Sequence, residues 1–144
     1  MTIAVAQNDS AEGQAALLHA ASEAVFQHST LAVLHVLDHT ERDADQRVAT
    51  VEAAVGRQLS EGGFADLDWA LHTATDEDSR ATALVELTEK VGADLLVLGS
   101  RRRTPIGKFL LGSTVQRVVL DSPVPVLVVK APVPASAATA SRQE

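Results

Sequence analysis

Short apolar runs alternate with longer helical patterns along most of the chain. Residues 2–6 and 31–37 are near-continuous apolar runs, which is typical of strands covered on both faces. Shorter runs predict three more strands, at residues 68–73, 95–98 and 124–129. Between these runs, apolar residues recur at the three- and four-residue spacing of one helix face. Four helices are therefore predicted, at about residues 10–28, 44–59, 79–91 and 113–120.

Capping and helix-ending residues stand at several of these boundaries. Ser10 and Ser79 stand where helix N-caps are expected, and the acidic run 76–78 suits a helix start because the helix dipole favours negative charge there. Glycines at 62–63 and at 92 follow the second and third helices and end them. The tail, residues 131–144, is rich in Ala, Pro and Ser and lacks core-forming residues, so we expect it to be disordered.

Five strands separated by four helices predict an α/β fold, with one doubly wound, mostly parallel sheet and helices on both faces. Ligands of such sheets bind beyond the carboxyl ends of the strands, where the strand order reverses. Two strand exits carry suitable polar residues: Asn8, Asp9 and Ser10 after the first strand, and residues 99–114 after the fourth. If the chain reverses between these two strands, both loops meet in one crevice.

Composition and charge narrow the classes of function. The chain has 144 residues, about one domain's worth, of which 46% are hydrophobic and 22% charged. It contains no cysteine, which excludes disulfides, thiolate metal sites and cysteine nucleophiles. No signal peptide is evident and no apolar run approaches the roughly 18 residues of a membrane span, so we expect a cytoplasmic protein that contacts no membrane. The net charge of −7 argues against nucleic-acid binding.

Positive charge is concentrated in one segment. Residues 99–120 carry no acid and five basic residues, Arg101, Arg102, Arg103, Lys108 and Arg117. Such a segment in an acidic protein suggests a site for a small anion. Gly99 directly follows a buried strand, where a side chain would obstruct a ligand, and Gly112, Ser113 and Thr114 precede a helix whose free N–H groups and dipole favour a phosphate. Alternatively, Gly99 makes a turn, Ser113 is an N-cap, and the arginines are solvated.

Other polar residues are weaker candidates. His35 and His39 are four residues apart, but no nearby Asp, Glu or His set completes a metal site, and the run 76–78 suits a helix start better than a divalent cation. No serine lies in a Gly-x-Ser-x-Gly elbow, and no carboxylate pair is placed for acid–base catalysis. We therefore expect neither a metal centre nor an enzyme.

The segment GSRRRTPIGKFLLGST resembles the phosphate loop of the universal stress proteins. Nucleotide-binding members of that family carry Gly-x2-Gly-x9-Gly-Ser/Thr after the fourth strand, and here Gly99 and Gly112–Ser113 match this frame while Arg102 stands at the second glycine. Further matches are Gly92–Ala93–Asp94, Leu34–His35–Val36 and the closing run Ser-Pro-Val-Pro-Val-Leu-Val-Val at 122–129. The resemblance covers about residues 2–130, so we assign residues 1–130 to a universal stress protein domain.

The resemblance implies a sheet of strand order 3-2-1-4-5, a homodimer joined through the fifth strand, and ATP binding in some members of the family and not in others. By position, adenine and ribose would lie near Ala6, Asn8 or Asp9, and Val36. The phosphates would lie along Gly99, Ser100, Arg101, Arg102, Gly112, Ser113 and Thr114. Because family members often have Asp-Gly-Ser where this chain has Asn8–Asp9–Ser10, the residue that faces the base is left open between Asn8 and Asp9.

Two hypotheses of different class follow. In the first, the protein is a homodimeric stress protein that binds ATP, ADP or AMP, with Mg²⁺ as a companion of the nucleotide, and occupancy alters its conformation or its binding of a protein partner. In the second, it is a dimeric interaction module that binds no nucleotide and whose basic loop contacts an acidic protein. Arg102 bears on both hypotheses. If its position requires φ > 0, a side chain there costs about 1–2 kcal/mol, which favours the second hypothesis. A guanidinium that bonds a phosphate contributes about 1.5–3 kcal/mol, which favours the first. A third hypothesis is that the protein is a slow ATPase.

Overall fold

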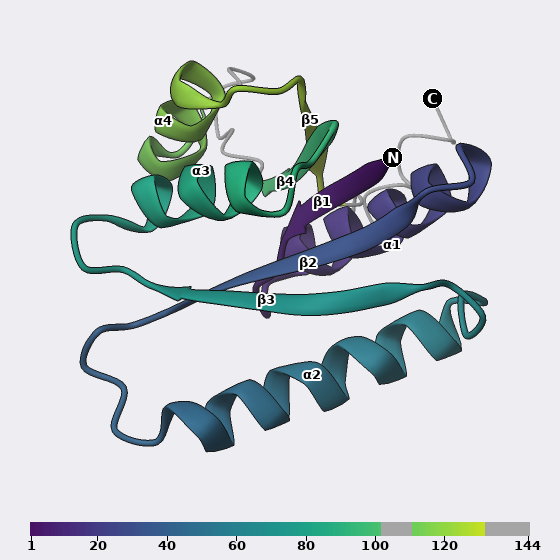
Figure 1. Cartoon of the computed structure of the whole chain (residues 1–144), viewed down its shortest axis with the longest axis horizontal. Coiled ribbons are helices and arrows are strands. Elements are labelled where there is room, and N and C mark those ends of the chain that lie inside the picture. The colour runs from purple at the N-terminus through teal and green to yellow at the C-terminus, as the bar shows by residue number, and fades with distance from the viewer. Residues whose placement is uncertain (102–110, 132–144) are drawn as a thin grey trace, which may run out of the picture.

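The structure, a computed structural model, describes residues 1–101 and 111–131. Within these ranges a five-stranded sheet is built from β1 (Thr2–Ala6), β2 (Thr30–Leu37), β3 (Trp69–Thr75), β4 (Leu95–Ser100) and β5 (Val126–Lys130). Four helices connect the strands in turn: α1 (Ala11–Phe26), α2 (Ala44–Glu61), α3 (Arg80–Lys90) and α4 (Ser113–Asp121). Figure 1 shows this alternation along the chain. None of the helices in the described ranges combines the length and apolar character that a membrane crossing needs.

The strand order is β3-β2-β1-β4-β5 and every neighbouring pair is parallel, which confirms the expected topology. The chain moves outward from β1 to β2 and β3, returns to the other side of β1 to form β4, and ends at β5. Val5 of β1 pairs with Val33 of β2 and with Val97 of β4, so β1 is the central strand. The reversal of strand order therefore lies between the carboxyl ends of β1 and β4, where a ligand crevice is expected.

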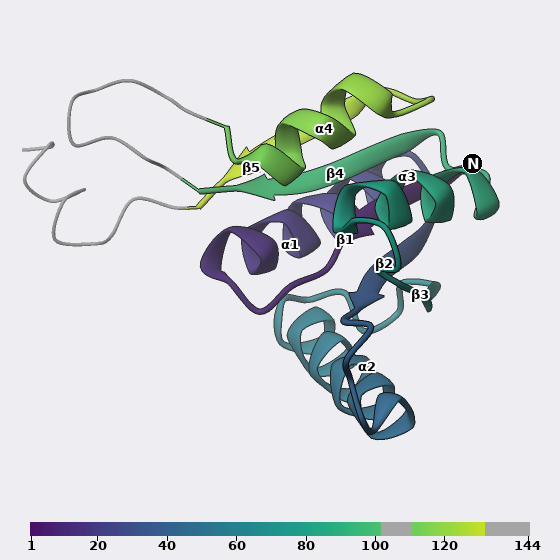
Figure 2. The same ribbon diagram turned by 90° about the vertical axis from the view of Figure 1, so that its left-hand side faces the viewer.

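Side chains alternate between two apolar cores, one on each face of the sheet. The core beneath α1 and α2 includes Val5, Val33 and Val97 from the strands, and the core beneath α3 and α4 includes Leu34, Leu96 and Leu98. Figure 2 shows α1 and α2 on one side of the sheet and α3 and α4 on the other. Because both faces are covered, the central strands are apolar throughout, which is why their sequences show no polar alternation.

Several boundaries differ from the sequence prediction. β4 continues through Gly99, which pairs with Val129, so Gly99 is a strand residue and the alternative that it makes a turn is wrong. α3 begins at Arg80 and has no acidic residue in its first turn, so the run 76–78 is not the acidic start of that helix. β3 extends to Thr75, and Asp76 accepts a hydrogen bond from the backbone N–H of His39, joining the exits of β2 and β3.

The expected caps are confirmed. The Ser10 hydroxyl accepts from the N–H of Gly13 at 3.0 Å, and that of Ser79 accepts from the N–H of Thr82 at 3.0 Å. Gly92 follows α3 with φ +65°, a conformation that glycine adopts without a steric cost. The expected disordered tail lies outside the described residues apart from Ala131.

Gly99 is the point of closest approach between a helix and the sheet. A Cβ atom at this position would lie 2.3 Å from the carbonyl oxygen of Glu12 and 2.9 Å from the N–H nitrogen of Gly13, both in the first turn of α1. We expected the missing side chain to leave room for a ligand. The space that the side chain would take is filled by α1 instead, because this face of β4 is the face on which α1 packs.

We predict that substitution by alanine changes the free energy of unfolding in opposite directions at Gly99 and Gly56. Gly99→Ala should lower the free energy of unfolding by about 1–3 kcal/mol, because helix backbone must move to admit the methyl group. Gly56→Ala is the matched control: a Cβ at Gly56 would lie 3.6 Å from Trp69, an ordinary contact, within helix α2. There, alanine should raise stability by up to about 1 kcal/mol. Urea unfolding of both variants measures this, and equal effects would contradict the packing role of Gly99.

Candidate functional site

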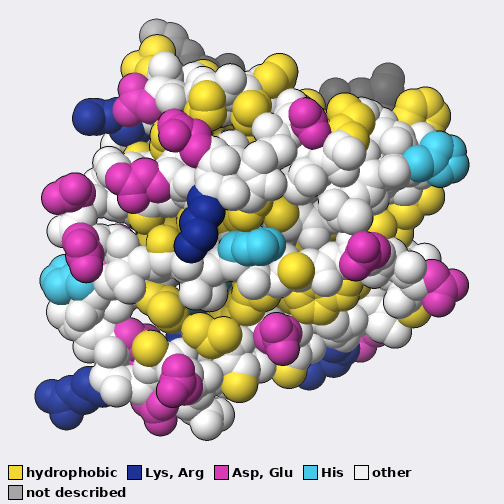
Figure 3. All heavy atoms as spheres, in the orientation of Figure 1, with side chains coloured by type: hydrophobic (Ala, Val, Ile, Leu, Met, Phe, Trp, Pro, Cys, Tyr) yellow, Lys and Arg dark blue, Asp and Glu magenta, His cyan; other side chains and the backbone are white. Residues whose placement is uncertain are grey.

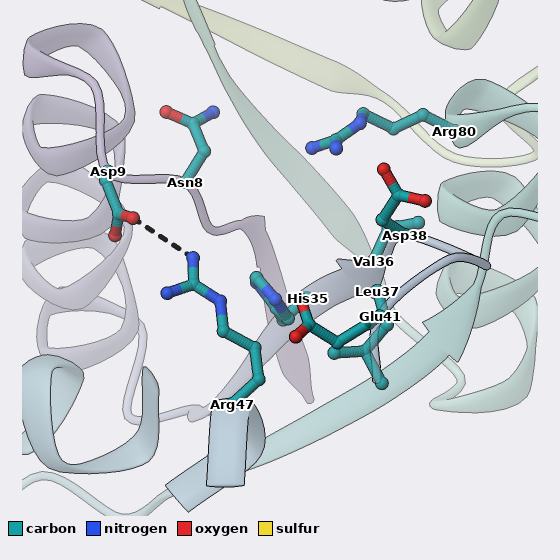
Figure 4. A pocket seen from close by; sticks show the side chains of 9 residues that line it. All are labelled: Asn8, Asp9, His35, Val36, Leu37, Asp38, Glu41, Arg47 and Arg80. Atoms are coloured by element: carbon teal, nitrogen blue, oxygen red, sulfur yellow. Dashed lines mark hydrogen bonds and ion pairs between the residues drawn. The ribbon is translucent and has the colours of Figure 1, made fainter. Parts of the chain in front are cut away.

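Two cavities open at the carboxyl edge of the sheet. The first has a volume of about 510 Å³ and lies among the exits of β1 and β2 and the first turns of α2 and α3; Figure 4 shows its nine lining residues. The second has a volume of about 360 Å³ and lies between the N-terminal turns of α3 and α4, where Ser79, Ser113 and Thr114 are among its lining residues. Arg80 lines both cavities, so the two meet at the first residue of α3.

Asn8 and Asp9, the two candidates for the base or ribose, have different partners. The side-chain oxygen of Asn8 accepts from the N–H of Ser10 at 3.0 Å and from the Ser10 hydroxyl, which holds the turn that starts α1. The Asp9 carboxylate lies 3.1 Å from the guanidinium of Arg47, which reaches it from α2 (Figure 4). Both residues line the first cavity. The side-chain oxygen of Asn8 is therefore used in the turn, whereas the Asp9 carboxylate forms an exposed ion pair with Arg47.

His35 forms the buried floor of the first cavity. Its ring is 6% exposed, and its Nδ1 lies 2.7 Å from the side-chain oxygen of Gln7. Burial lowers the pKa of His35 below its ordinary value, and the positive charges of Arg47 and Arg80 lower this pKa further. His35 is thus neutral at pH 7, and because an amide oxygen only accepts, the proton of the neutral ring is on Nδ1.

The end of β4 supplies a buried hydroxyl and a paired arginine. Ser100 is 2% exposed, and within the described residues its hydroxyl oxygen has no hydrogen-bond partner. By strand alternation it projects toward the α3 and α4 face, as Leu96 and Leu98 do. The next residue, Arg101, lies 3.7 Å from the carboxylate of Glu12 in α1.

The positive segment is less isolated than its sequence suggests. Glu12 pairs with Arg101, and Asp121, one residue beyond the acid-free segment, pairs with Arg117 at 2.8 Å. Although residues 99–120 contain no acid, folding brings one acid to them from α1 and helical spacing brings the other. Arg102, Arg103 and Lys108 lie outside the described residues. On the face shown in Figure 3, acidic side chains outnumber basic ones and are widely spread.

Among the described residues, no side chain caps the N-terminus of α4. Gly112 occupies the N-cap position and makes no side-chain capping bond, so the alternative that Ser113 is the N-cap is wrong. A Cβ atom at Gly112 would meet no described atom within 4 Å. Ser113 and Thr114 instead lie in the first turn and line the second cavity. The free N–H groups of this turn, together with the helix dipole, make it suited to an anion.

The structure brings most of the predicted site residues to this edge. Asn8, Asp9 and Val36 line the first cavity, and Ser113 and Thr114 line the second. Ala6 is buried at the end of β1 on the α3 and α4 face.

Six lining residues of the first cavity were not predicted from the sequence: His35, Leu37, Asp38, Glu41, Arg47 and Arg80. The available signal for Arg80 was a cation directly after the N-cap Ser79, where a helix normally avoids positive charge.

A group of possible metal ligands was also missed. The ligand atoms of Asp38, His39 and Asp76 all lie within 4.8 Å of one another, whereas the sequence predicted no such set. Hydrogen bonds account for this arrangement: Asp38 accepts from the N–H and hydroxyl of Thr40 at 2.8 and 2.7 Å, and Asp76 accepts from the N–H of His39 at 2.7 Å. The bond between His39 and Asp76 joins the exits of β2 and β3, and the bonds between Asp38 and Thr40 hold the turn after β2.

Comparison with known proteins identifies the family. The family model described as "Universal stress protein family" matches residues 1–130. This chain belongs to the universal stress protein family. The match spans all five strands and four helices, so it includes both cavities of the site.

Curated members of the family resemble parts of the chain. A universal stress protein of Methanocaldococcus jannaschii is 44% identical over 62 residues, which is 43% of this chain. One of Mycolicibacterium smegmatis is 51% identical over 47 residues, or 33% of this chain. Each match spans 36% of the relative's own length.

Solved structures share the fold over nearly the whole chain. A universal stress protein of Archaeoglobus fulgidus has 27% identity and a TM-score of 0.70, covering 90% of this chain and 98% of that one. A universal stress protein in complex with cAMP has 21% identity and a TM-score of 0.69, covering 92% and 98%. An A. fulgidus protein in complex with dAMP has 22% identity and a TM-score of 0.68, covering 90% and 98%. Two of these three family structures are thus complexes with adenine nucleotides.

The lowered pKa of His35 predicts a pH dependence of stability. Since the folded state holds its proton less tightly than the unfolded state does, stability is complete above the ordinary pKa of 6.5 and falls as the pH drops below it. Gln7, Arg47, Arg80 and Asp9 are the groups that act on His35, and of these only Asp9 and Gln7 favour its charged form.

The test compares the wild-type protein with His35→Gln, which retains an amide to bond Gln7. Urea unfolding at pH 7.5 and 5.5 should show a larger loss of stability on acidification for the wild-type protein than for the variant. The comparison isolates His35, because all other residues are the same in both proteins. Equal losses would show that His35 does not carry the effect.

Proposed function

We propose that this universal stress protein binds an adenine nucleotide, ATP, ADP or AMP, across the two cavities at the carboxyl edge of its sheet. The observation that carries the proposal is that the two cavities are neighbours, with Arg80 in the lining of both. One cavity is large enough for a nucleoside, since small-molecule sites have volumes of about 300–1,000 Å³. The other is bounded by the N-terminal turns of two helices. The complexes of related structures with cAMP and dAMP support a nucleotide as the ligand class.

The first cavity would hold adenine and ribose. Val36 gives it an apolar wall at the end of β2, and Ala6 lies at the end of the adjacent strand β1. Of the two polar candidates, Asp9 suits the ribose, because a carboxylate accepts hydrogen bonds from hydroxyl groups and its present partner Arg47 is partly exposed. Asn8, whose oxygen holds the turn, would shape the wall rather than read the base.

The second cavity would hold the phosphates. The first turn of α4 offers its N–H groups and the hydroxyls of Ser113 and Thr114, and no described atom would lie within 4 Å of a Cβ at Gly112. Ser100 adds a buried hydroxyl without a partner among the described residues, a group that a ligand oxygen would satisfy. Arg101 would exchange its 3.7 Å contact with Glu12 for a phosphate. Arg102, on the same loop, would add charge, and Mg²⁺ would arrive on the phosphate oxygens of the nucleotide.

Binding rather than catalysis is the proposed activity, with ATP hydrolysis at most slow. In this proposal nucleotide occupancy in a cytoplasmic stress response alters the loop after β4 or a surface that a protein partner reads. A homodimer through β5 is part of the same proposal. β5 forms one edge of the sheet, and its residues Val126, Leu127, Val128 and Val129 are each only partly buried within one chain. An apolar edge strand of this kind needs a cover.

A second candidate function is an interaction module of the same family that binds no nucleotide. Two observations favour it: Arg102 stands at a glycine of the family's loop, and Arg101 already has a carboxylate partner in Glu12. In that case the basic loop would contact an acidic protein.

Isothermal titration calorimetry tests the nucleotide proposal. The wild-type protein should bind at least one of ATP, ADP and AMP at millimolar concentration or below. A Ser113→Ala, Thr114→Val double variant should bind at least about tenfold more weakly, because each hydroxyl bond to a charged phosphate is worth about 1.5–3 kcal/mol. Stability should not change, since neither side chain caps α4.

The matched control is Ser60→Ala, which removes an exposed serine hydroxyl from α2, away from both cavities. It should leave affinity unchanged. Absence of heat with all three nucleotides would leave the interaction module as the better account.

Sedimentation velocity tests the dimer. Over a concentration series the protein should sediment as a dimer or as a monomer–dimer equilibrium that shifts with concentration. A monomer at every concentration would refute the pairing through β5.

A further inference from the structure

Among the described residues, Arg80 is the one that the linings of the two cavities share. It is the first residue of α3, and its side chain is exposed at the junction. Figure 4 shows its guanidinium extending from α3 over the first cavity, toward the side on which Asn8 lies. A ligand that occupies both cavities must therefore pass this guanidinium.

The other arginines of the two cavities already have partners. Arg47 pairs with Asp9 at 3.1 Å, and Arg117 pairs with Asp121 at 2.8 Å. Among the described residues, no carboxylate oxygen lies within 4.0 Å of the Arg80 guanidinium nitrogens, although the carboxyl of Asp38 is close enough for Arg80 to help lower its pKa. Arg80 thus offers a guanidinium that a ligand can take without first breaking an ion pair.

The start of α3 is an unfavourable position for a cation. The N-terminal turn of a helix carries a partial positive charge, so an arginine there is opposed by the helix dipole. The capping of α3 is carried out by Ser79, whose hydroxyl bonds the N–H of Thr82. The positive charge of Arg80 adds to that of the helix end, and together they create a local attraction for an anion on a protein whose net charge is −7.

We propose that Arg80 binds the phosphate group next to the ribose and is the residue by which the protein selects nucleotides over nucleosides. This inference rests on the proposed nucleotide binding and identifies the group that reads the phosphate. A nucleotide with its base beside Val36 and its phosphates beside Ser113 places its first phosphate at the junction, where Arg80 stands. A guanidinium matches two phosphate oxygens at once, so a lysine there would keep the charge and lose the paired geometry.

Calorimetric titration of adenosine, AMP and ATP into the wild-type protein and into Arg80→Gln tests this inference. The variant should bind AMP and ATP about 10- to 100-fold more weakly, by similar factors, because both ligands carry the first phosphate. Adenosine, which has no phosphate, should bind both proteins equally. Arg80→Lys should fall between the wild-type protein and Arg80→Gln. Arg57→Gln, which removes an exposed arginine in α2 away from both cavities, is the matched control and should change nothing.

The outcomes separate the two proposals. Nucleotide binding by the wild-type protein with unchanged affinity in Arg80→Gln would overturn the role of Arg80 and leave the proposed function standing. A loss for ATP alone would also overturn it, since Arg80 would then read a later phosphate. No binding of AMP or ATP by the wild-type protein would overturn both. The midpoint of thermal unfolding of Arg80→Gln should equal or exceed that of the wild-type protein, and a lower midpoint would show a structural role instead.

Discussion

The close contact between the first turn of α1 and the backbone of β4 at Gly99 determines how the two halves of the sheet meet. Because no side chain separates them, the carbonyl of Glu12 and the N–H of Gly13 lie directly over the strand. This contact sets the β1–α1 loop, with Asn8 and Asp9, beside the end of β4, with Ser100 and Arg101. The crevice at the reversal of strand order follows from it, and so does the ion pair between Glu12 and Arg101.

Charges around this crevice are arranged in pairs that connect different elements. Asp9 with Arg47 ties the β1–α1 loop to α2, and Glu12 with Arg101 ties α1 to the end of β4. Both pairs are partly exposed, so each adds about 0–1 kcal/mol to stability and is open to exchange with a ligand. Beside these pairs, Arg80 and the N-terminal turns of α3 and α4 are positive, and the acids Asp38, Glu41 and Asp78 also line the two cavities. Arg80 and these helix ends are therefore the groups through which the crevice would attract the proposed nucleotide to an acidic molecule.

Much of this arrangement could be predicted from the sequence. The alternation of buried strands with helices established the parallel sheet, and the loop motif located the edge at which β1 and β4 end. Long-range packing could not be predicted: the reason for Gly99 lies in α1, the partner of Arg101 lies in α1, and Arg47 reaches Asp9 across 38 positions. The group of Asp38, His39 and Asp76 was missed for the same reason, since β2 and β3 exits meet only in the folded sheet. The alternative that Ser113 is the N-cap of α4 was also wrong, because Gly112 occupies that position.

The central claim is that a nucleotide spans the two cavities with its base at the ends of β1 and β2 and its phosphates at the start of α4. A crystal structure grown with ATP tests it most directly. The account predicts density for adenine beside Val36, for the first phosphate within hydrogen-bonding distance of Arg80, and for the remaining phosphates beside Ser113 and Thr114. A nucleotide seated elsewhere on the molecule, or a crevice without nucleotide density at saturating ATP, would contradict it.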